Sequence, residues 1–186
     1  SNEDAEADAV EFAFAGEFVD GYMTAHSISK ISWTQQSEGS APSVFHFRDY
    51  DAANKTVIAE NDETNEYNPG KWSRFDIHLN GEGIWFCQSA YDADDQAAAT
   101  AAESAPTDNV AETGCGGEFP WSQLTLATPP TMIGDYVDQY MGQHSLTANT
   151  WTQAYEGSEP SSFIFTQWDE SAQRLIAYNA DGNAFS

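Results

Sequence analysis

Positive charge is scarce in this sequence. Its 186 residues include six Lys or Arg against thirty Asp or Glu, which gives a formal net charge of −24 at pH 7. Nucleic acids and anionic lipid surfaces are polyanions, and an acidic surface repels them. We therefore exclude nucleic acid as a partner, whereas cations, including divalent ones, are attracted.

Long apolar runs and reaction motifs are also missing. No apolar run reaches the ~20 residues of a transmembrane helix, so we expect no transmembrane segment. No nucleophile elbow, HExxH pattern, phosphate-binding loop or dinucleotide fingerprint occurs. Close carboxylate pairs are expected by chance among thirty acids and do not indicate a glycosidase. We predict that the protein is not an enzyme.

Cysteine is limited to Cys87 and Cys115, with no CxxC pair and no His at zinc-finger spacing. The simpler prediction is a disulfide, which would close a loop of about 29 residues and stabilise the fold by ~3–4 kcal/mol. It implies an oxidising compartment and therefore an exported protein, extracellular or at the cell or outer-membrane surface. The alternative is a reduced pair in the cytosol.

An internal duplication is the strongest feature that is present. Adding 118 to the residue number aligns Gly16–Asn68 with Gly134–Ser186 without a gap, which predicts two copies of one structural unit. The first copy continues to about Leu126, but the second has no counterpart of Pro69–Cys115. We expect either a longer natural chain or a second molecule that supplies the missing part.

The apolar residues alternate with a period of two, which is typical of strands. We predict an all-β fold, an antiparallel meander of six short strands that closes as a small barrel or sandwich and is duplicated. One Ala-rich helix, Tyr91–Glu103, is predicted before the second cysteine. The predicted organisation is an acidic flexible tether (1–11), a first β module (12–126) and a second, truncated copy (127–186).

Four single residues and three longer segments form a recognisable pattern along the chain. The residues are Gly16, Tyr22, His26 and Trp33, and the segments are Asn68-Pro69-Gly70-Lys71-Trp72-Ser73-Arg74-Phe75-Asp76, Trp85-Phe86-Cys87-Gln88-Ser89-Ala90-Tyr91-Asp92 and Cys115-Gly116-Gly117. Together they resemble an uncharacterised repeat domain of secreted proteins and lipoproteins of proteobacteria, across both copies. The resemblance implies export and the disulfide but no activity. The acidic start is typical of a tether after a lipidated cysteine, and a tag remnant is the alternative.

Aromatic and histidine residues that recur in both copies are the candidate ligand-binding residues: Tyr22, His26, Trp33, Tyr140, His144 and Trp151. Sugars stack on Trp and Tyr faces, and His can donate a hydrogen bond or hold a metal ion. The pair Tyr50/Trp168 belongs to the same group. The alternative is that the rings form the core and the histidines hold turns.

Calcium is the ion that such a composition favours, because calcium takes several oxygen ligands. The candidate ligands are Asp51, Asn61, Asn65, Asp169, Asn179, Asp181 and Asn183. The alternative is that these residues only form turns. For Arg74 we predict an ion pair with Asp76 or another acid.

The sequence supports two functional hypotheses. The first is a non-catalytic binding or adhesion module that takes a protein or glycan partner, with calcium as its one candidate cofactor. The second is a subunit of an extracellular fibre, in which Ala9–Ala15 self-associates by adding a strand to the incomplete second copy of another molecule.

Overall fold

The structure is a computed structural model that describes residues 14–183, so the predicted tether and most of Ala9–Ala15 lie outside it. The first copy contains eight strands, β1 (Gly16–Val19), β2 (Ala25–Ile28), β3 (Ser32–Gln36), β4 (Ser43–Asp51), β5 (Thr56–Asn61), β6 (Trp72–Asn80), β7 (Gly83–Ala93) and β8 (Ser122–Leu126). The second contains β9 (Gly134–Val137), β10 (Gln143–Leu146), β11 (Thr150–Ala154), β12 (Ser161–Asp169) and β13 (Arg174–Asn179). One helix, α1 (Gln96–Ala101), lies between β7 and β8.

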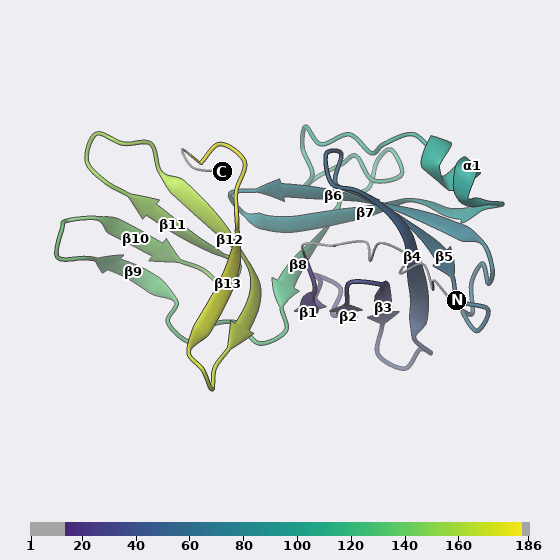
Figure 1. Ribbon diagram of the computed structural model, residues 1–186, viewed down its shortest axis with the longest axis horizontal. Coiled ribbons are helices and arrows are strands. Elements are labelled where there is room, and N and C mark those ends of the chain that lie inside the picture. The colour runs from purple at the N-terminus through teal and green to yellow at the C-terminus, as the bar shows by residue number, and fades with distance from the viewer. Residues whose placement is uncertain (1–13, 184–186) are drawn as a thin grey trace, which may run out of the picture.

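The first copy is a closed antiparallel barrel in which each strand pairs with its neighbours in sequence (Figure 1). The barrel closes where β1 meets β8, with Phe18 opposite Leu126 and Val19 opposite Thr125. Inward residues of every strand form one aromatic core around Trp33, which is 0% exposed. The all-β, duplicated prediction is confirmed, with a barrel rather than a sandwich in the first copy.

Two strands and the helix boundaries differ from the sequence-based expectation. Neither β2 nor β8 was predicted, because Ala25–Ile28 and Ser122–Leu126 are short and carry few apolar residues. Helix α1 begins only after Asp95, whose carboxylate accepts a hydrogen bond from the amide of Ala98 as an N-cap. The predicted residues Tyr91–Ala93 instead extend β7, since pairing with β6 reaches Ala93.

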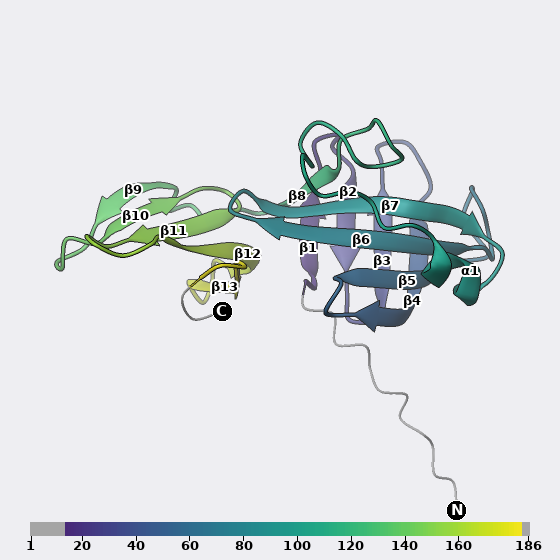
Figure 2. The same ribbon diagram turned by 90° about the horizontal axis from the view of Figure 1, so that it is seen from above.

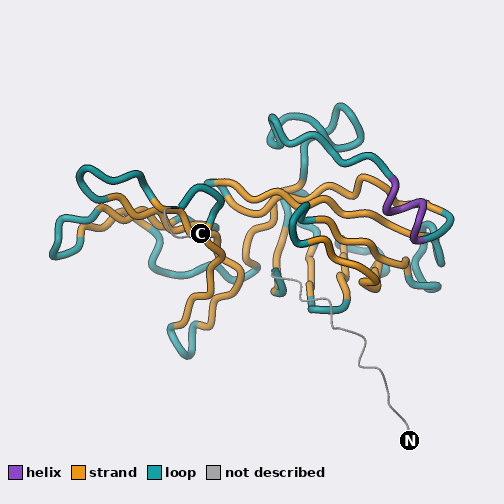
Figure 3. Tube along the Cα trace, turned by 45° about the horizontal axis from the view of Figure 1, so that its top comes forward, coloured by secondary structure: helices purple, strands orange, loops and turns teal. Residues whose placement is uncertain are grey.

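The second copy is an open sheet in the order β13-β12-β11-β10-β9, beside the barrel (Figures 1 and 2). It repeats the pairing of β1 to β5, including a β-bulge between Phe165 and Gln167 that matches the one between Phe47 and Asp49. Within residues 14–183 the outer strands β9 and β13 each pair on one side only. Figure 3 shows this contrast between a closed barrel and an open sheet whose β12–β13 hairpin turns away from the strands β9–β11.

The two copies share a core rather than forming separate units. In the second copy Ile164, Tyr178 and Ala180 replace polar residues of the first, namely His46, Glu60 and Asp62. Ile164 is 0% exposed, and the Tyr178 ring lies 5.3 Å from that of Phe14. Apolar substitutions on the outer face of β12 and β13 therefore accompany docking of this sheet against the barrel.

The predicted disulfide between Cys87 and Cys115 is present. It closes a small second core, outside the barrel, that contains Trp85, Val110 and Trp121. The bond thus pins the long β7–β8 connection to the outer face of β7. The predicted ion pair is also present: Arg74 Nε lies 2.9 Å from Asp76 Oδ1, and both side chains are buried.

Arg74 also explains where the helix ends. Its guanidinium donates to the carbonyl oxygens of Thr100 and Ala102 and to the Ser104 hydroxyl. Carbonyls at a helix C-terminus lack intrahelical partners and carry partial negative charge, so a buried cation is favourable there. Asp76 completes the network by accepting from the amide of Ala105.

Candidate functional site

One end of the barrel opens into a polar cavity of about 630 Å³. In a meander the connections β1–β2, β3–β4, β5–β6 and β7–β8 all lie at the same end, and residues near these connections line the cavity. The lining is rich in hydroxyls and carboxylates: Asp20, Thr24, His26, Gln35, Ser37, Gly39, Ser40, Ala41, Ser43, Glu66, Tyr67, Phe86 and Ser122. We call it the mouth cavity.

A chain of contacts joins the mouth cavity to the core. The indole Nε1–H of Trp33 donates to Nδ1 of His26 over 3.1 Å, which places the ring proton of a neutral His26 on Nε2. Asp20 Oδ2 lies 3.2 Å from Nε2 but outside hydrogen-bond geometry. Asp20 Oδ1 accepts from the amides of Tyr22 and Thr24, which fixes the β1–β2 turn.

Two buried donors beside the cavity lack acceptors. Among the residues that the structure describes, neither His26 Nε2 nor Gln35 Nε2 has a hydrogen-bond partner. A buried donor without a partner costs about 1–3 kcal/mol, so such groups are uncommon outside functional sites. Both side chains belong to the cavity lining, where an incoming oxygen atom would satisfy them.

Burial sets the charge of His26. Removal from water lowers the pKa of this imidazole below its usual 6.5, although the Asp20 carboxylate, 3.2 Å from Nε2, opposes the shift. His26 is therefore neutral at physiological pH, and Asp20 and Glu66 are the acidic side chains of the lining. In the described part of the chain no cluster of three or more His, Cys, Asp or Glu side chains is arranged to hold a metal ion.

In the second copy, whose sheet is open, a tyrosine stands at one of the positions that line the mouth cavity of the first. Thr24 and Ser37, whose hydroxyls lie 3.1 Å apart, correspond to Gly142 and Tyr155. A Cβ atom on Gly142 would lie 2.3 Å from the Tyr155 ring, so the glycine makes room for the ring. The Tyr155 hydroxyl donates to Asp138 Oδ2 over 3.2 Å. The two substitutions fit together and place the Tyr155 ring, which is 43% exposed, over Asp138 and His144.

The histidine contacts recur beneath that tyrosine. Trp151 Nε1–H donates to His144 Nδ1 over 3.2 Å, and His144 Nε2 hydrogen-bonds Asp138 Oδ2 over 3.1 Å. The His144 bond, followed by the amide of Gly142, lowers the pKa of Asp138 to about 2. The His144 imidazole therefore has an acceptor that its counterpart in the first copy lacks.

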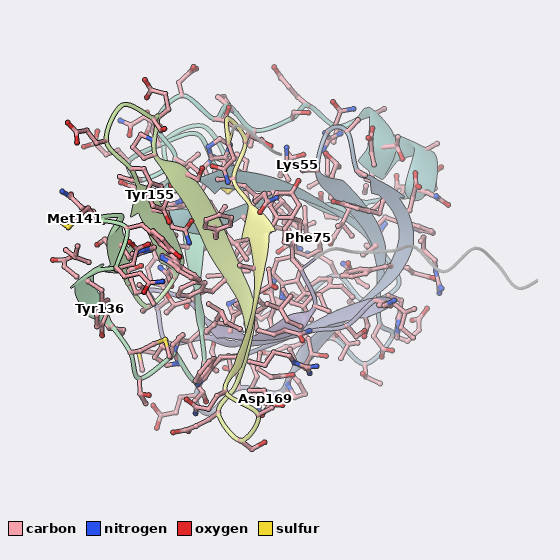
Figure 4. All side chains as sticks on the ribbon, turned by 60° about the vertical axis from the view of Figure 1, so that its left-hand side comes forward. Lys55, Phe75, Tyr136, Met141, Tyr155 and Asp169 are labelled. Atoms are coloured by element: carbon pink, nitrogen blue, oxygen red, sulfur yellow. A yellow bond between two sulfur atoms is a disulfide. The ribbon has the colours of Figure 1, made fainter. Side chains whose placement is uncertain are left out.

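The structure separates the six predicted ligand-binding residues. His26 lines the mouth cavity, but Trp33 lies wholly in the core and offers no face for stacking. Tyr22 and Tyr140 are 73% and 75% exposed on the β1–β2 and β9–β10 turns. Met141, next to Tyr140, lies at the edge of the molecule in Figure 4. Trp151 and His144 line a different groove, on the inner face of that sheet.

The predicted calcium ligands do not converge on one point. Asp51 and Asp169 cap the β4–β5 and β12–β13 turns by accepting backbone amides, and Figure 4 shows Asp169 at a hairpin tip. Asn65 and Asn183 each bond both backbone groups of one partner residue, Val44 and Ser162.

The remaining candidates are likewise apart. Asn61 is buried and bonds the carbonyls of Asn68 and Tyr91, while its counterpart Asn179 ends the exposed strand β13. Asp181 lies 3.0 Å from Lys55 Nζ. The residues with hydrogen bonds named above form turns or bind backbone groups. Asp181 contacts Lys55 of the other copy, and calcium binding stays a prediction.

Among the described residues that line the mouth cavity, no serine is hydrogen-bonded to His26. One ring nitrogen accepts from Trp33 and the other faces Asp20, so neither is hydrogen-bonded to any of the cavity serines. A serine nucleophile needs a base within hydrogen-bond reach. The cavity groups are suited to holding a ligand by hydrogen bonds.

Sequence reasoning missed several cavity residues, among them Gln35, Ser37, Glu66 and Tyr67. Gln35 recurs as Gln153, and this identity was a usable signal. Ser37 could have been found from a difference between the copies, since this small polar residue stands where the second copy has Tyr155. Glu66 and Tyr67 reach the cavity from the β5–β6 loop, which no periodicity identifies.

Comparison with protein-family models, with curated proteins and with solved structures finds no match to this chain. The resemblance to a repeat domain of secreted proteins and lipoproteins therefore stays a prediction. Within residues 14–183 no helix is long and apolar enough to cross a membrane.

Proposed function

We propose that the protein is an exported, non-catalytic binding module whose first-copy mouth cavity holds a glycan. The observation that carries this proposal is the open polar cavity at Thr24 and Ser37, where the second copy instead has Gly142 and the Tyr155 ring. The disulfide is compatible with export. On this proposal the duplication supplies a scaffold, and the first copy alone binds the ligand.

The cavity chemistry favours a neutral, polyhydroxylated ligand. Asp20 and Glu66 accept hydrogen bonds from sugar hydroxyls and repel anions, while His26 Nε2–H and the Gln35 amide donate to sugar oxygens. Tyr67, 72% exposed at the rim, offers a ring face on which a pyranose stacks. These are the few convergent polar groups and one aromatic surface that a small-molecule site needs.

A glycan array probed with the labelled full chain tests the proposal, followed by saturation-transfer NMR with each hit. We expect Tyr67→Ala to weaken binding at least about tenfold, since it removes the stacking surface. Tyr91→Ala is the matched control, because Tyr91 is 56% exposed in the same module but outside the cavity lining. The proposal is wrong if no glycan binds, or if both variants bind a hit equally well.

A further inference from the structure

The inner face of the second sheet carries an apolar groove of about 480 Å³. Its lining includes the residues that correspond to the barrel core of the first copy. Tyr136, His144, Leu146, Trp151 and Leu175 stand where the barrel has Phe18, His26, Ile28, Trp33 and Val57. The groove is thus the inner surface of a barrel that is half built within the described residues.

Exposure of these matched residues differs most at one position. Phe18 is 1% exposed in the barrel, whereas Tyr136 is 48% exposed in the sheet and lies at the edge of the molecule in Figure 4, while Leu146 is buried like Ile28. Ala59 is 0% exposed and its counterpart Ala177 is exposed. Large exposed apolar residues of this kind mark interaction surfaces.

The barrel shows what covers such a face. Strand β6 pairs with β5, and this pairing puts Phe75 opposite Val57 and Ser73 opposite Ala59. The Phe75 ring then stacks on Trp33, with centroids 4.8 Å apart and planes 28° apart. In the second copy, β13 corresponds to β5, and no strand of residues 14–183 pairs with its outer edge.

The basic residues of the β6 segment also favour its binding to this acidic chain. Lys71 and Arg74, in and beside β6, are two of the six basic residues in a chain of net charge −24. A segment with this pattern is attracted to the acidic chain as it approaches. The N-terminal segment is a poor donor by comparison, since Phe14 is 1% exposed and packed in its own molecule's core.

We propose that β13 and the groove accept an added strand from a segment that repeats the β6 pattern of this module. The strand resembles β6: it extends the sheet antiparallel to β13 and places one aromatic ring opposite Leu175, stacked on Trp151. Main-chain hydrogen bonds supply affinity and the ring pocket supplies selectivity, as in other cases of strand addition. This inference concerns the second copy and is independent of the glycan site.

The test uses a fluorescein-labelled peptide with the sequence of residues 70–80 and the full chain. We expect saturable binding, weakened at least about tenfold when the peptide carries the Phe75→Ser change. The protein variant Tyr136→Ser should weaken binding comparably. Val137→Ser is the matched control, because Val137 is 63% exposed on the same strand but outside the groove.

Hydrogen exchange locates the bound peptide. The proposal predicts slower amide exchange across Arg174–Asn179 and unchanged exchange in β9, the other edge strand. Protection elsewhere, absence of binding, or binding that ignores the peptide substitution would overturn it. A dimer of the full chain would also overturn the proposal if Tyr136→Ser abolished it and excess peptide did not. The groove would then bind the groove of a second molecule rather than a strand.

Discussion

The indole of Trp33 donates to Nδ1 of His26 over 3.1 Å, inside the barrel, and Trp151 repeats this bond to His144 over 3.2 Å. Because an imidazole with an occupied Nδ1 acceptor carries its proton on Nε2, the bond turns a donor toward Asp20 and the mouth cavity. The core therefore determines what the site offers to a ligand.

His26 should titrate below pH 6.5. Burial lowers its pKa, so at acidic pH the unfolded chain binds a proton that the folded chain does not. Stability is then complete above about pH 6.5 and is lost as the pH falls from there toward the folded pKa. NMR titration of the imidazole Cε1–H checks this, with the urea-unfolded chain as reference. A folded-state midpoint at or above the unfolded one would contradict it.

Removal of the disulfide should cost about 3 kcal/mol of unfolding free energy, because the cross-link restricts the unfolded chain. The double variant Cys87→Ala/Cys115→Ala should also expose Trp121, which is 3% exposed beside the bond. Urea denaturation followed by tryptophan fluorescence measures both effects. Reduction of the unaltered protein is the control and should reproduce both effects. An unchanged unfolding midpoint would show that the disulfide does not stabilise the fold.

Asn65→Ala should destabilise the first copy by about 2 kcal/mol. The Asn65 amide bonds both the N–H and the carbonyl of Val44 at 2.8 Å, and truncation leaves the Val44 N–H without this acceptor, while the carbonyl keeps its bond from the Asp62 amide. Asn54→Ala, at an exposed turn, is the control and should stay within about 0.5 kcal/mol. Equal losses from the two changes would show that Asn65 has no special structural role.

Chelation should leave stability unchanged. The seven oxygen-bearing residues considered for calcium are spread over turns and strand ends, each with local partners. We expect thermal unfolding with EDTA and with excess calcium to agree to within about 1 °C, since a ligand that binds only the folded state would raise the midpoint. A calcium-dependent rise would show that a site forms where none is evident from these contacts.

The duplication and the period-two pattern were sufficient to predict the β fold, because the repeated Trp33, Phe45 and Phe47 mark inward positions. Strand β2 escaped prediction since its inward residues are His26 and Ile28, one of them polar. Helix α1 was predicted too long, because Ala-rich composition gave no sign that β6 would hold Tyr91–Ala93 by pairing. Long-range pairing overrides local propensity at such places.

The candidate site was harder to predict than the fold. Identity between the copies pointed to His26 and Trp33 together, but identity alone does not separate a core ring from a cavity residue. The informative positions were those at which the copies differ, Thr24/Gly142 and Ser37/Tyr155. These differences can be interpreted only from the structure, in which the Tyr155 ring occupies the space left by Gly142 and bonds Asp138.

Introducing the glycine and tyrosine of the second copy into the first tests the central claim most directly. The double variant Thr24→Gly/Ser37→Tyr places a tyrosine ring at the mouth cavity, and its fold can be checked by circular dichroism and urea denaturation. Glycan affinity should then fall at least about a hundredfold, because the ring occupies the cavity. Binding that survives in the folded double variant would place the glycan elsewhere and contradict the account.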